Sequence, residues 1–335
     1  MELQELFTYL ETPKNIVLIT HVRPDGDAVG SSLALQHYLS GFGHTVQSIV
    51  PDDIPSFLQW MPGAASLYNH QRNPKTCFAV LTKADCIFFL DFNALKRVEA
   101  IATDIAKLRN KTVTVMIDHH REPDFFTDYM LWDAEASSTA ELIYRFIHLH
   151  GHPEKMTLEA AQCIYTGMVT DTGVFQYSNT TPAVHTIAAD LMSRGVDAES
   201  IHNAVYNQFG ENRLRFVGYL LSEKMVVLAE QRAAYMSISI QEAERFSLST
   251  GDKEGIVNLP LSMKEVDIAV LFTEDKDRIK ISFRSKSHVN VEGLARNFFK
   301  GGGHINAAGG STRQNLADTI AYFEKVLPEY LTSIT

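Results

Sequence analysis

Aspartate and histidine side chains recur at four places before residue 172 of this 335-residue chain. The four places are His21-Val22-Arg23-Pro24-Asp25-Gly26-Asp27, Asp91, Asp118-His119-His120 and Asp171. The first three follow or end apolar runs of the kind that form buried strands, and the fourth follows a helical segment. Because the carboxyl ends of parallel strands meet at one edge of a sheet, we expect these side chains to converge there.

Imidazole and carboxylate groups without a thiolate are the ligand set of Mn²⁺, Mg²⁺, Fe²⁺ or Zn²⁺ chemistry rather than of a structural zinc site. Four clustered carboxylates exceed what one ion needs and would repel one another without at least two divalent cations. Two ions bridged by one carboxylate are the usual machinery of phosphoester hydrolysis. In Asp25-Gly26-Asp27 the glycine permits a sharp turn, so each aspartate can face a different ion.

Each of these residues also has a purely structural interpretation. Asp25 or Asp91 alone can be a helix N-cap, as strand-end aspartates often are. The His119-His120 pair alone can lie in a surface turn, and Asp171 alone can begin a turn. The purely structural interpretations would all have to be true at once, and at equivalent positions of the predicted sheet. The combined pattern therefore favours a metal site.

A glycine-rich segment near the carboxyl terminus, Gly301–Gly310, permits close approach of the backbone to a phosphate or a nucleoside edge. It has neither the glycine spacing of a dinucleotide fingerprint nor the Lys-Ser/Thr pair of a P-loop. Arg284 and Lys286, at the end of a predicted strand, supply the cations that a phosphate would bind. Taken alone, such a glycine-rich turn is more often a packing device, and both interpretations stay open here.

The hydrophobic pattern predicts the elements that position these residues. Residues 15–20, 86–92 and 112–117 are apolar runs separated by helical segments, which is typical of a parallel sheet covered on both faces. Ser138 and Glu141 form a capping-box pattern and predict the start of a helix.

Beyond about residue 215, the two runs 267–273 and 278–284 predict a β-hairpin. The acidic excess of the chain lies before this point, whereas residues 276–300 are locally basic, which suggests two domains with different roles. The predicted fold class is therefore α/β: an N-terminal, mostly parallel sheet flanked by helices, joined by a helical linker to a smaller α/β C-terminal domain.

The composition argues against several classes of protein. Lys and Arg total 30 against 40 Asp and Glu, and the resulting net charge of −10 disfavours binding of long duplex DNA, whose affinity comes from cationic contacts. Three cysteines are too few for a disulfide framework, and no apolar run approaches the ~20 residues that span a bilayer. The amino-terminal segment is unlike a signal peptide. We therefore expect a cytoplasmic protein that binds no membrane.

The motifs, in this order, resemble those of the DHH phosphoesterases, and most closely their nano-RNase and pAp-phosphatase branch, which is related to RecJ and to family II pyrophosphatases. His21–Ser31 resembles the first motif, Asp91 the second, Asp118-His119-His120 the third and Asp171 the fourth. Gly301–Gly310 is similar to the signature of the DHH-associated C-terminal domain. The resemblance implies a catalytic domain with a di-metal site over 1–190, a helical linker over 191–215 and a substrate-binding domain over 216–335.

The resemblance also implies roles for individual residues. One ion would be held by His21 and Asp25, the other by Asp27, His119 and Asp171, and Asp91 would bridge the two. Both ions would be divalent, with Mn²⁺ expected first and Mg²⁺ or Co²⁺ as alternatives. The catalytic residues would be Asp91, Asp118 and His120. His120 would face the scissile phosphate, and Asp118 would support the site. Arg284, Gly302, Gly303 and His304 would bind the terminal phosphate or nucleotide.

The activity implied is hydrolysis of very short oligoribonucleotides or linear dinucleotides to mononucleotides, and of 3′-phosphoadenosine 5′-phosphate (pAp) to AMP, by attack of metal-activated water on phosphorus. The alternatives are an exopolyphosphatase or inorganic pyrophosphatase, a phosphodiesterase of signalling dinucleotides, and a nucleotide-binding module without turnover. The physiological substrate, the cleavage polarity, the metal preference and the oligomeric state, a homodimer included, stay open at this stage.

Overall fold

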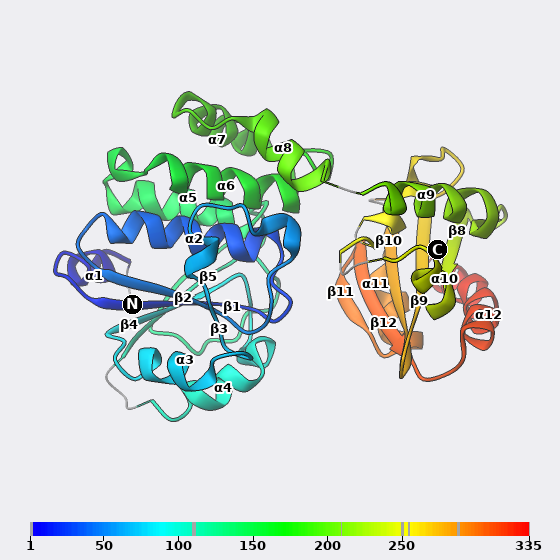
Figure 1. Ribbon diagram of the computed structural model, residues 1–335, viewed down its shortest axis with the longest axis horizontal. Helices are drawn as coiled ribbons and strands as arrows, with labels where there is room; N and C mark the ends of the chain where they lie inside the picture. The colour runs from blue at the N-terminus through cyan, green and yellow to red at the C-terminus, as the bar shows by residue number, and fades with distance from the viewer. Residues whose placement is uncertain are drawn as a thin grey trace. The chain divides into compact units, whose positions relative to one another are not determined.

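The computed structural model describes residues 3–108, 112–208, 210–248, 251–253, 255–286 and 289–334. These residues form two compact units, one up to Gln208 and one that follows it. Each unit has its own sheet and its own apolar core, so each is described separately (Figure 1). Within the described residues, no helix combines the length and the apolar character needed to cross a membrane.

The first unit is built on a six-stranded sheet in which all neighbouring strands are parallel. In chain order the strands are β1 (Asn15–Thr20), β2 (Thr45–Val50), β3 (Tyr68–Asn69), β4 (Cys86–Leu90), β5 (Val113–Asp118) and β6 (Tyr129–Trp132). Their spatial order is β3-β2-β1-β4-β5-β6. The adjacent strands β1, β4 and β5 are the three that the sequence predicts, because burial on both faces makes them almost continuously apolar.

Helices cover both faces of this sheet (Figure 1). The helices of this unit are α1 (Leu3–Tyr9), α2 (Gly26–Ser40), α3 (Pro74–Leu81), α4 (Ala100–Ile105), α5 (Thr139–His150), α6 (Leu158–Asp171), α7 (Pro182–Ser193) and α8 (Ala198–Tyr206). Of these, α7 and α8 lie beyond α5 and α6 rather than on the sheet (Figure 1). Helices α2, α5 and α6 share the larger core with one face of the sheet, whereas α3 and α4 contribute to a second core on the other face. The predicted parallel α/β architecture is therefore confirmed.

The crossing of α2 and α6 is unusually close. A Cβ at Gly30 would lie 2.6 Å from the main-chain oxygen of Cys163, and one at Gly26 would lie 2.4 Å from the side chain of Thr170. Glycine therefore lets the two helices approach backbone to backbone. This contact brings the first turn of α2 next to the last turn of α6, which carries Asp171.

The second unit has a mixed six-stranded sheet in the order β11-β12-β10-β9-β8-β7. Its strands are β7 (Val226–Leu228), β8 (Ala233–Ile238), β9 (Ile268–Asp275), β10 (Arg278–Ser285), β11 (Gly302–His304) and β12 (Ala307–Thr312). Its helices are α9 (Glu211–Tyr219), α10 (Ile240–Arg245), α11 (Val291–Phe299) and α12 (Leu316–Ile334). Strands β9 and β10 pair antiparallel across a two-residue turn, so the predicted hairpin is confirmed.

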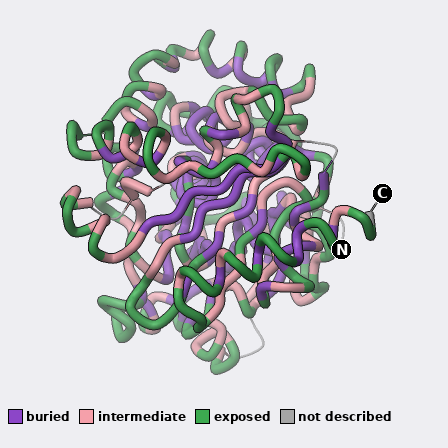
Figure 2. Tube along the Cα trace, turned by 90° about the vertical axis from the view of Figure 1, so that its right-hand side faces the viewer, coloured by how far each residue is buried: buried purple, intermediate pink, exposed green. Residues whose placement is uncertain are grey.

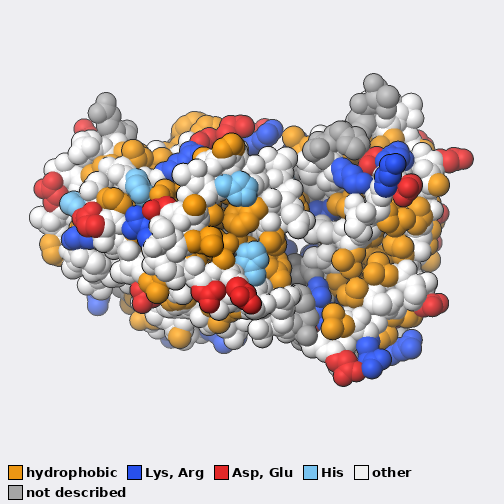
Figure 3. Space-filling view, turned by 90° about the horizontal axis from the view of Figure 1, so that it is seen from above, with side chains coloured by type: hydrophobic (Ala, Val, Ile, Leu, Met, Phe, Trp, Pro, Cys, Tyr) orange, Lys and Arg blue, Asp and Glu red, His pale blue; other side chains and the backbone are white. Residues whose placement is uncertain are grey.

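Short helical turns complete the two units. They are 3₁₀-helices at Ser56–Leu58, Ala64–Ser66, Leu95–Val98, Pro153–Lys155 and Ile256–Ser262, and a π-helical turn at Leu220–Lys224. Figure 2 shows buried stretches of chain running together as neighbouring strands, while the outer sides of the helices are exposed. On the face drawn in Figure 3, acidic, basic and apolar side chains of the first unit are interspersed, so its acidic excess is not gathered there.

The segment predicted as a linker, 191–215, divides between the two units. Helix α8 packs in the first core through Ile201 and Val205. Helix α9, which begins within the same segment, packs in a core of the second unit through Phe216. The domain boundaries at 190 and 216 stay predictions.

Candidate metal centre

The loop after β1 leads directly into α2 and places three of the predicted ligands. Asp25 is the N-cap of α2, and its Oδ1 accepts hydrogen bonds from the main-chain N–H groups of Asp27 and Ala28, both at 3.1 Å. Asp27 lies in the first turn and is buried. The Nδ1 of His21 lies 2.8 Å from the oxygen of Val22, which turns Nε2 toward the acidic residues. Asp25 therefore is an N-cap, as one interpretation predicted, and also lies in the cluster.

Asp91 follows β4 and lies at the centre of the cluster. Its backbone is left-handed, with φ of 65°, and its side chain is 3% exposed. Oδ2 lies 3.3 Å from Nε2 of His21, whereas Oδ1 lies 3.6 Å from Nε2 of His119 and 3.7 Å from Nδ1 of His120. The two oxygens of one carboxylate thus face different imidazoles.

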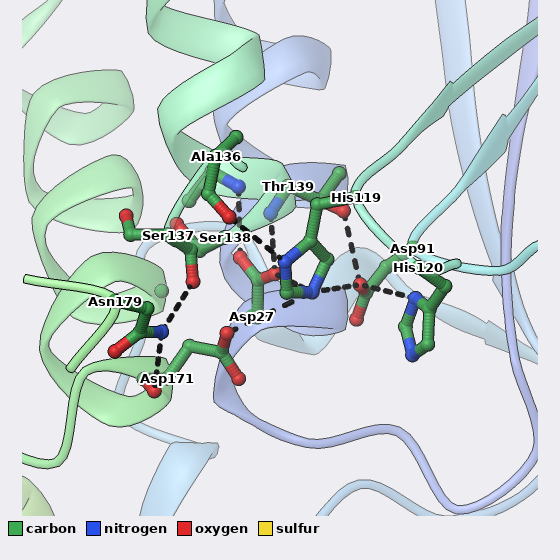
Figure 4. Close-up of polar contacts among 12 residues, drawn as sticks. Asp27, Asp91, His119, His120, Ala136, Ser137, Ser138, Thr139, Asp171 and Asn179 are labelled. Carbon is green, nitrogen blue, oxygen red and sulfur yellow. Dashed lines mark hydrogen bonds and ion pairs between the residues drawn. The ribbon is translucent and has the colours of Figure 1, made fainter. Parts of the chain in front are cut away.

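The segment at the end of β5 brings two imidazoles to the same edge (Figure 4). Nδ1 of His119 lies 3.3 Å from the oxygen of Ala136, so Nε2 faces the carboxylates of Asp27 at 3.9 Å and Asp171 at 3.7 Å. Nδ1 of His120 is 2.8 Å from Oδ1 of the fully buried Asp118. A carboxylate therefore fixes the ring of His120 and turns its Nε2 to the opposite side.

The structure brings together all of the predicted metal ligands. Three sets of three residues have ligand atoms within 4.8 Å of one another, and one of them, Asp91, His119 and His120, shares one residue with each of the other two. We call His21, Asp25 and Asp91 the first donor group, and Asp27, His119 and Asp171 the second donor group. The contact between Asp91 and His119 joins them.

Burial and mutual repulsion dominate the electrostatics of the carboxylates. Burial, reinforced by the charges of Asp91 and Asp171, raises the pKa of Asp27 well above its usual value. Burial also raises the pKa of Asp171, with the charges of Asp25 and Asp91 adding to it. Burial alone would do the same to Asp91, but the surrounding imidazoles outweigh it and lower the pKa of this carboxyl.

The histidines respond in the opposite direction. Burial would lower the pKa of His21, but hydrogen bonding and the charge of Asp91 raise it to about 9. The charges of Asp91, Asp27 and Asp118 likewise outweigh burial and raise the pKa of His119. The cluster therefore collects protons to offset its negative charge, and divalent cations would offset that charge in their place. Imidazole nitrogens and carboxylate oxygens with these separations fit such ions.

The residues predicted to bind substrate lie in the sheet of the second unit. Arg284 of β10 and His304 of β11 both pair with Ala307 of the intervening strand β12, so they lie at the same level two strands apart. The residues that flank Arg284 in β10 are buried, so by strand alternation Arg284 belongs to the face opposite that core. Gly302 lies two residues before His304 in β11, opposite Gly309 of β12.

The glycine-rich segment forms the β11–β12 hairpin rather than an irregular loop. Gly303 has φ of 146°, and a Cβ there would lie 2.6 Å from the main-chain oxygen of Ala307. A Cβ at Gly301 would lie 1.9 Å from the oxygen of Gly309. At these two positions glycine is required by strand packing, which is the structural interpretation that the sequence left open.

Several residues that contact the cluster were not predicted from the sequence. They are Ala136, Thr139 and Ala140 around the start of α5, and Asn179. All of them except Ala140 are labelled in Figure 4. The capping-box pattern was the one signal near them. Ser138 does cap α5 by accepting from the N–H of Glu141 at 3.1 Å, but the carboxylate of Glu141 accepts from the N–H of Ser137 at 2.7 Å, one residue before the expected partner.

A two-unit α/β chain with imidazoles and carboxylates at the carboxyl edge of a parallel sheet defines a class of candidate metal-dependent proteins. Comparison with family models is more specific, because residues 15–168 match the DHH family N-terminal domain and residues 230–331 match the DHHA1 domain. The chain belongs to the DHH family.

Several relatives match almost the whole chain. The bifunctional oligoribonuclease and PAP phosphatase NrnA of Bacillus subtilis is 29% identical over 92% of both chains. The protein of the same name from Thermus thermophilus is 27% identical over 99% of this chain and 93% of its own.

Solved structures show the same fold. An exopolyphosphatase-related protein from Bacteroides fragilis superposes with a TM-score of 0.94 and is 40% identical, over 97% of this chain and 95% of its own. RecJ from Thermus thermophilus, crystallised in complex with Mn²⁺, superposes with a TM-score of 0.54 at 15% identity, over 98% of this chain and 54% of its own, which shows the fold alone.

Proposed function

We propose that this protein is a phosphoesterase that depends on two divalent metal ions, with Mn²⁺ expected first, and that it hydrolyses very short oligoribonucleotides or linear dinucleotides to mononucleotides and pAp to AMP. The observation that carries the proposal is the meeting of the two donor groups at Asp91 and His119, whose Oδ1 and Nε2 are 3.6 Å apart. Near-full-length relatives named oligoribonuclease and PAP phosphatase support the substrate class.

The donor groups divide the proposed ligands between two ions. His21 and Asp25 would hold one, Asp27, His119 and Asp171 would hold the other, and Asp91, which faces both groups, would contribute to each. When bound, such ions supply Lewis acidity toward a phosphate oxygen and lower the pKa of a coordinated water. The chain itself supplies the six proposed ligands from the ends of β1, β4 and β5 and from α2 and α6, so these groups are oriented before substrate arrives.

His120 has the geometry of a proton donor in this reaction. Asp118 lies 2.8 Å from Nδ1, which orients the ring so that Nε2 is the atom directed to the phosphate ester in this proposal. Hydrolysis forms a bond from the water oxygen to phosphorus and breaks the bond to the leaving oxygen. The attacking water loses one proton to the solvent, and the leaving oxygen gains the proton of His120, which the solvent then replaces. Asp118 fixes the orientation of the ring.

In the second unit we assign Arg284 and His304 to the terminal phosphate or nucleotide. Both residues pair with Ala307 and so lie level with each other on one face of the sheet, with Gly302 near them. This arrangement supports a flat binding site for an anionic substrate. A guanidinium is suited to this because it forms two parallel hydrogen bonds to a phosphate. Gly303 is assigned to the same site through its backbone.

A turnover panel tests the proposal. Purified protein in Mn²⁺ buffer is given a diribonucleotide, a 24-mer RNA, pAp, pApA, cyclic di-AMP and pyrophosphate, each with and without chelator. We expect the diribonucleotide, pApA or pAp to be preferred and the activity to vanish on chelation and in Asp91→Asn, which keeps a residue suited to the left-handed backbone. Activity that survives chelation would overturn the proposal.

A second candidate is hydrolysis of phosphoanhydrides, as in an exopolyphosphatase or inorganic pyrophosphatase. The name of the Bacteroides fragilis protein, which is 40% identical to this chain, favours it. The same panel distinguishes the two, with long-chain polyphosphate added. Turnover of polyphosphate or pyrophosphate well above that of every nucleotide would favour the second candidate.

A further inference from the structure

The turn that leads into α5, residues 136–140, contacts both donor groups although none of its residues belongs to either (Figure 4). The main-chain N–H of Thr139 donates to Oδ2 of Asp27 at 2.6 Å, and that of Ala140 donates to Oδ1 at 2.8 Å. Both oxygens of this buried carboxylate are therefore held by the first turn of a helix, where the N–H groups have no partner within the helix.

Thr139 makes a second contact, through its side chain. Its hydroxyl donates to Oδ1 of Asp91 at 2.9 Å. Rotation of the Asp91 carboxylate about its Cβ–Cγ bond would break this hydrogen bond. The hydroxyl therefore selects the rotation that turns Oδ1 toward His119 and leaves Oδ2 facing His21.

The helix does not need this hydroxyl. Ser138 is the N-cap of α5, and its own side chain accepts from the N–H of Glu141. Thr139 occupies the first helical position, N1, and the side chain that caps the helix belongs to the residue before it. Its β-branched side chain is fully buried, so the hydrogen bond to Asp91 is shielded from water.

The turn itself is held from both sides. Glu141, which is almost fully buried, accepts from the N–H of Ser137 at 2.7 Å and pairs with Arg145, which also bonds Asp133 at 2.7 Å. On the other side, Nδ2 of Asn179 donates to the oxygen of Ser137 at 2.9 Å and to the oxygen of Asp171 at 3.3 Å. The position of Thr139 is thus fixed relative to both donor groups.

We propose that Thr139 is a positioning residue of the metal centre: its N–H orients Asp27 and its hydroxyl orients Asp91, so that one residue aligns a carboxylate from each donor group. This inference rests on the proposed function, because it assumes that the donor groups hold cations. Supporting partners of metal ligands commonly account for 10–100-fold in affinity or activity.

The test compares Thr139→Val, which removes the hydroxyl and keeps the shape and the N–H, with Thr139→Ser, which keeps the hydroxyl. Mn²⁺ binding to the full chain is measured by titration calorimetry, and turnover of a diribonucleotide is measured beside it. We expect Thr139→Val to raise the Kd for Mn²⁺ by about 10–100-fold and to lower kcat with little change in KM. Thr139→Ser should bind and turn over within about threefold of wild type.

Thr166→Val is the matched control. Thr166 is also fully buried, on α6, and its hydroxyl bonds the oxygen of Gln162 within its own helix at 2.8 Å. This variant should keep wild-type Mn²⁺ affinity. Thermal unfolding of the chelated proteins checks folding, and Thr139→Ala replaces Thr139→Val if the valine variant does not fold.

The outcomes separate the two proposals. The positioning role is overturned if Thr139→Val and Thr139→Ala bind Mn²⁺ as tightly as wild type, or if Thr139→Ser binds it as weakly as Thr139→Val. Either result leaves the proposed function standing. A wild-type protein that binds no divalent cation overturns the proposed function, and the positioning role with it.

Discussion

The two donor groups differ in how far the protein encloses them. The difference lies in the most exposed ligand of each group, because the side chain of Asp25 is 61% exposed in the first, whereas that of Asp171, the most exposed in the second, is 30% exposed. Both oxygens of Asp27 are also held by main-chain N–H groups from a different helix. An enclosed and pre-oriented set of ligands loses less freedom when an ion binds. We therefore expect the second donor group to bind its cation more tightly than the first.

Substitution of Asp27 should break the tighter site and have the largest effect. In Asp27→Asn the amide NH₂ would face a main-chain N–H, because both carboxylate oxygens accept from such groups, so the side chain can neither keep its position nor bind a cation well. We expect kcat/KM to fall about 10³-fold, beyond the 10–100-fold typical of residues that only support a ligand. Calorimetry should show loss of the tighter Mn²⁺-binding event, and its retention would contradict the comparison.

Substitution of Asp25 should weaken the looser site alone. Asparagine is an equally good N-cap, so Asp25→Asn should leave α2 intact and raise the Kd of the weaker event by about 10–100-fold. Activity should return as the Mn²⁺ concentration is increased, which Asp27→Asn should not allow.

The control is Asp197→Asn, at the N-cap of α8, where Oδ1 accepts from the N–H of Ser200 at 3.1 Å. This variant should match wild type in both binding events. If Asp25→Asn abolished both events instead, the two donor groups would act as a single site and the comparison would fail.

Packing behind the second donor group offers a sharper test. A Cβ at Gly167 of α6 would lie 2.6 Å from Cβ of Ala140 and 3.0 Å from Oδ1 of Asp27. Gly167→Ala should therefore destabilise the fold by about 1–3 kcal/mol and weaken the tighter Mn²⁺-binding event more than the other. Thermal unfolding and calorimetry measure both effects.

Gly218→Ala is the contrasting substitution, because nothing lies within 4 Å of a Cβ at that position in α9. Alanine favours a helix over glycine by about 1 kcal/mol, so this variant should be as stable as wild type or more so. Equal behaviour of the two alanine variants would show that Gly167 has no special role beside Asp27.

The smallest expected effect is on the pH dependence of stability, and it comes from His150, which lies outside the donor groups. His150 contacts the rings of Phe7 and Phe42 and lies 2.8 Å from the hydroxyl of Tyr38. Burial, with the charges of His152, His44 and Lys155, lowers its pKa to about 4, opposite to the shift of His21.

Since an unfolded histidine titrates near ~6.5, the unfolded state takes up this proton first as the pH falls. The stability contributed by neutral His150 is thus present above ~6.5 and is lost as the pH falls toward 4. After solvent screening the loss between pH 7 and 5 should be on the order of 1 kcal/mol. Urea unfolding with chelator should show it in wild type, and His150→Gln should reduce the pH dependence by that amount.

The central strands could be predicted from the sequence, and the ligands at their ends could be predicted with them. Strands β1, β4 and β5 are buried on both faces and so are nearly continuous apolar runs, and their carboxyl ends place Asp91 and the pair His119-His120. Strands β2, β3 and β6 were not predicted, because they are short or interrupted by polar residues such as Gln47 and Ser48.

The supporting contacts could not be predicted, because they depend on tertiary approach. Thr139 lies 112 residues from Asp27 and 48 from Asp91 along the chain, and only the packing of α5 beside α2 joins them. No local pattern distinguishes a threonine that bonds a distant carboxylate from one at the start of an ordinary helix. The glycine-rich segment was ambiguous for a related reason, since the strand pairing that requires Gly303 appears only in the fold.

The left-handed backbone of Asp91 also limits how this chain can evolve. One base change in an aspartate codon gives Asn, Gly, His, Tyr, Ala, Val or Glu. Glycine and asparagine adopt this backbone at low cost, but neither carries a charge, whereas glutamate keeps the charge and is strained there. No single-step replacement satisfies both demands, so a lineage that loses Asp91 must regain the same residue or abandon the centre that Asp91 joins.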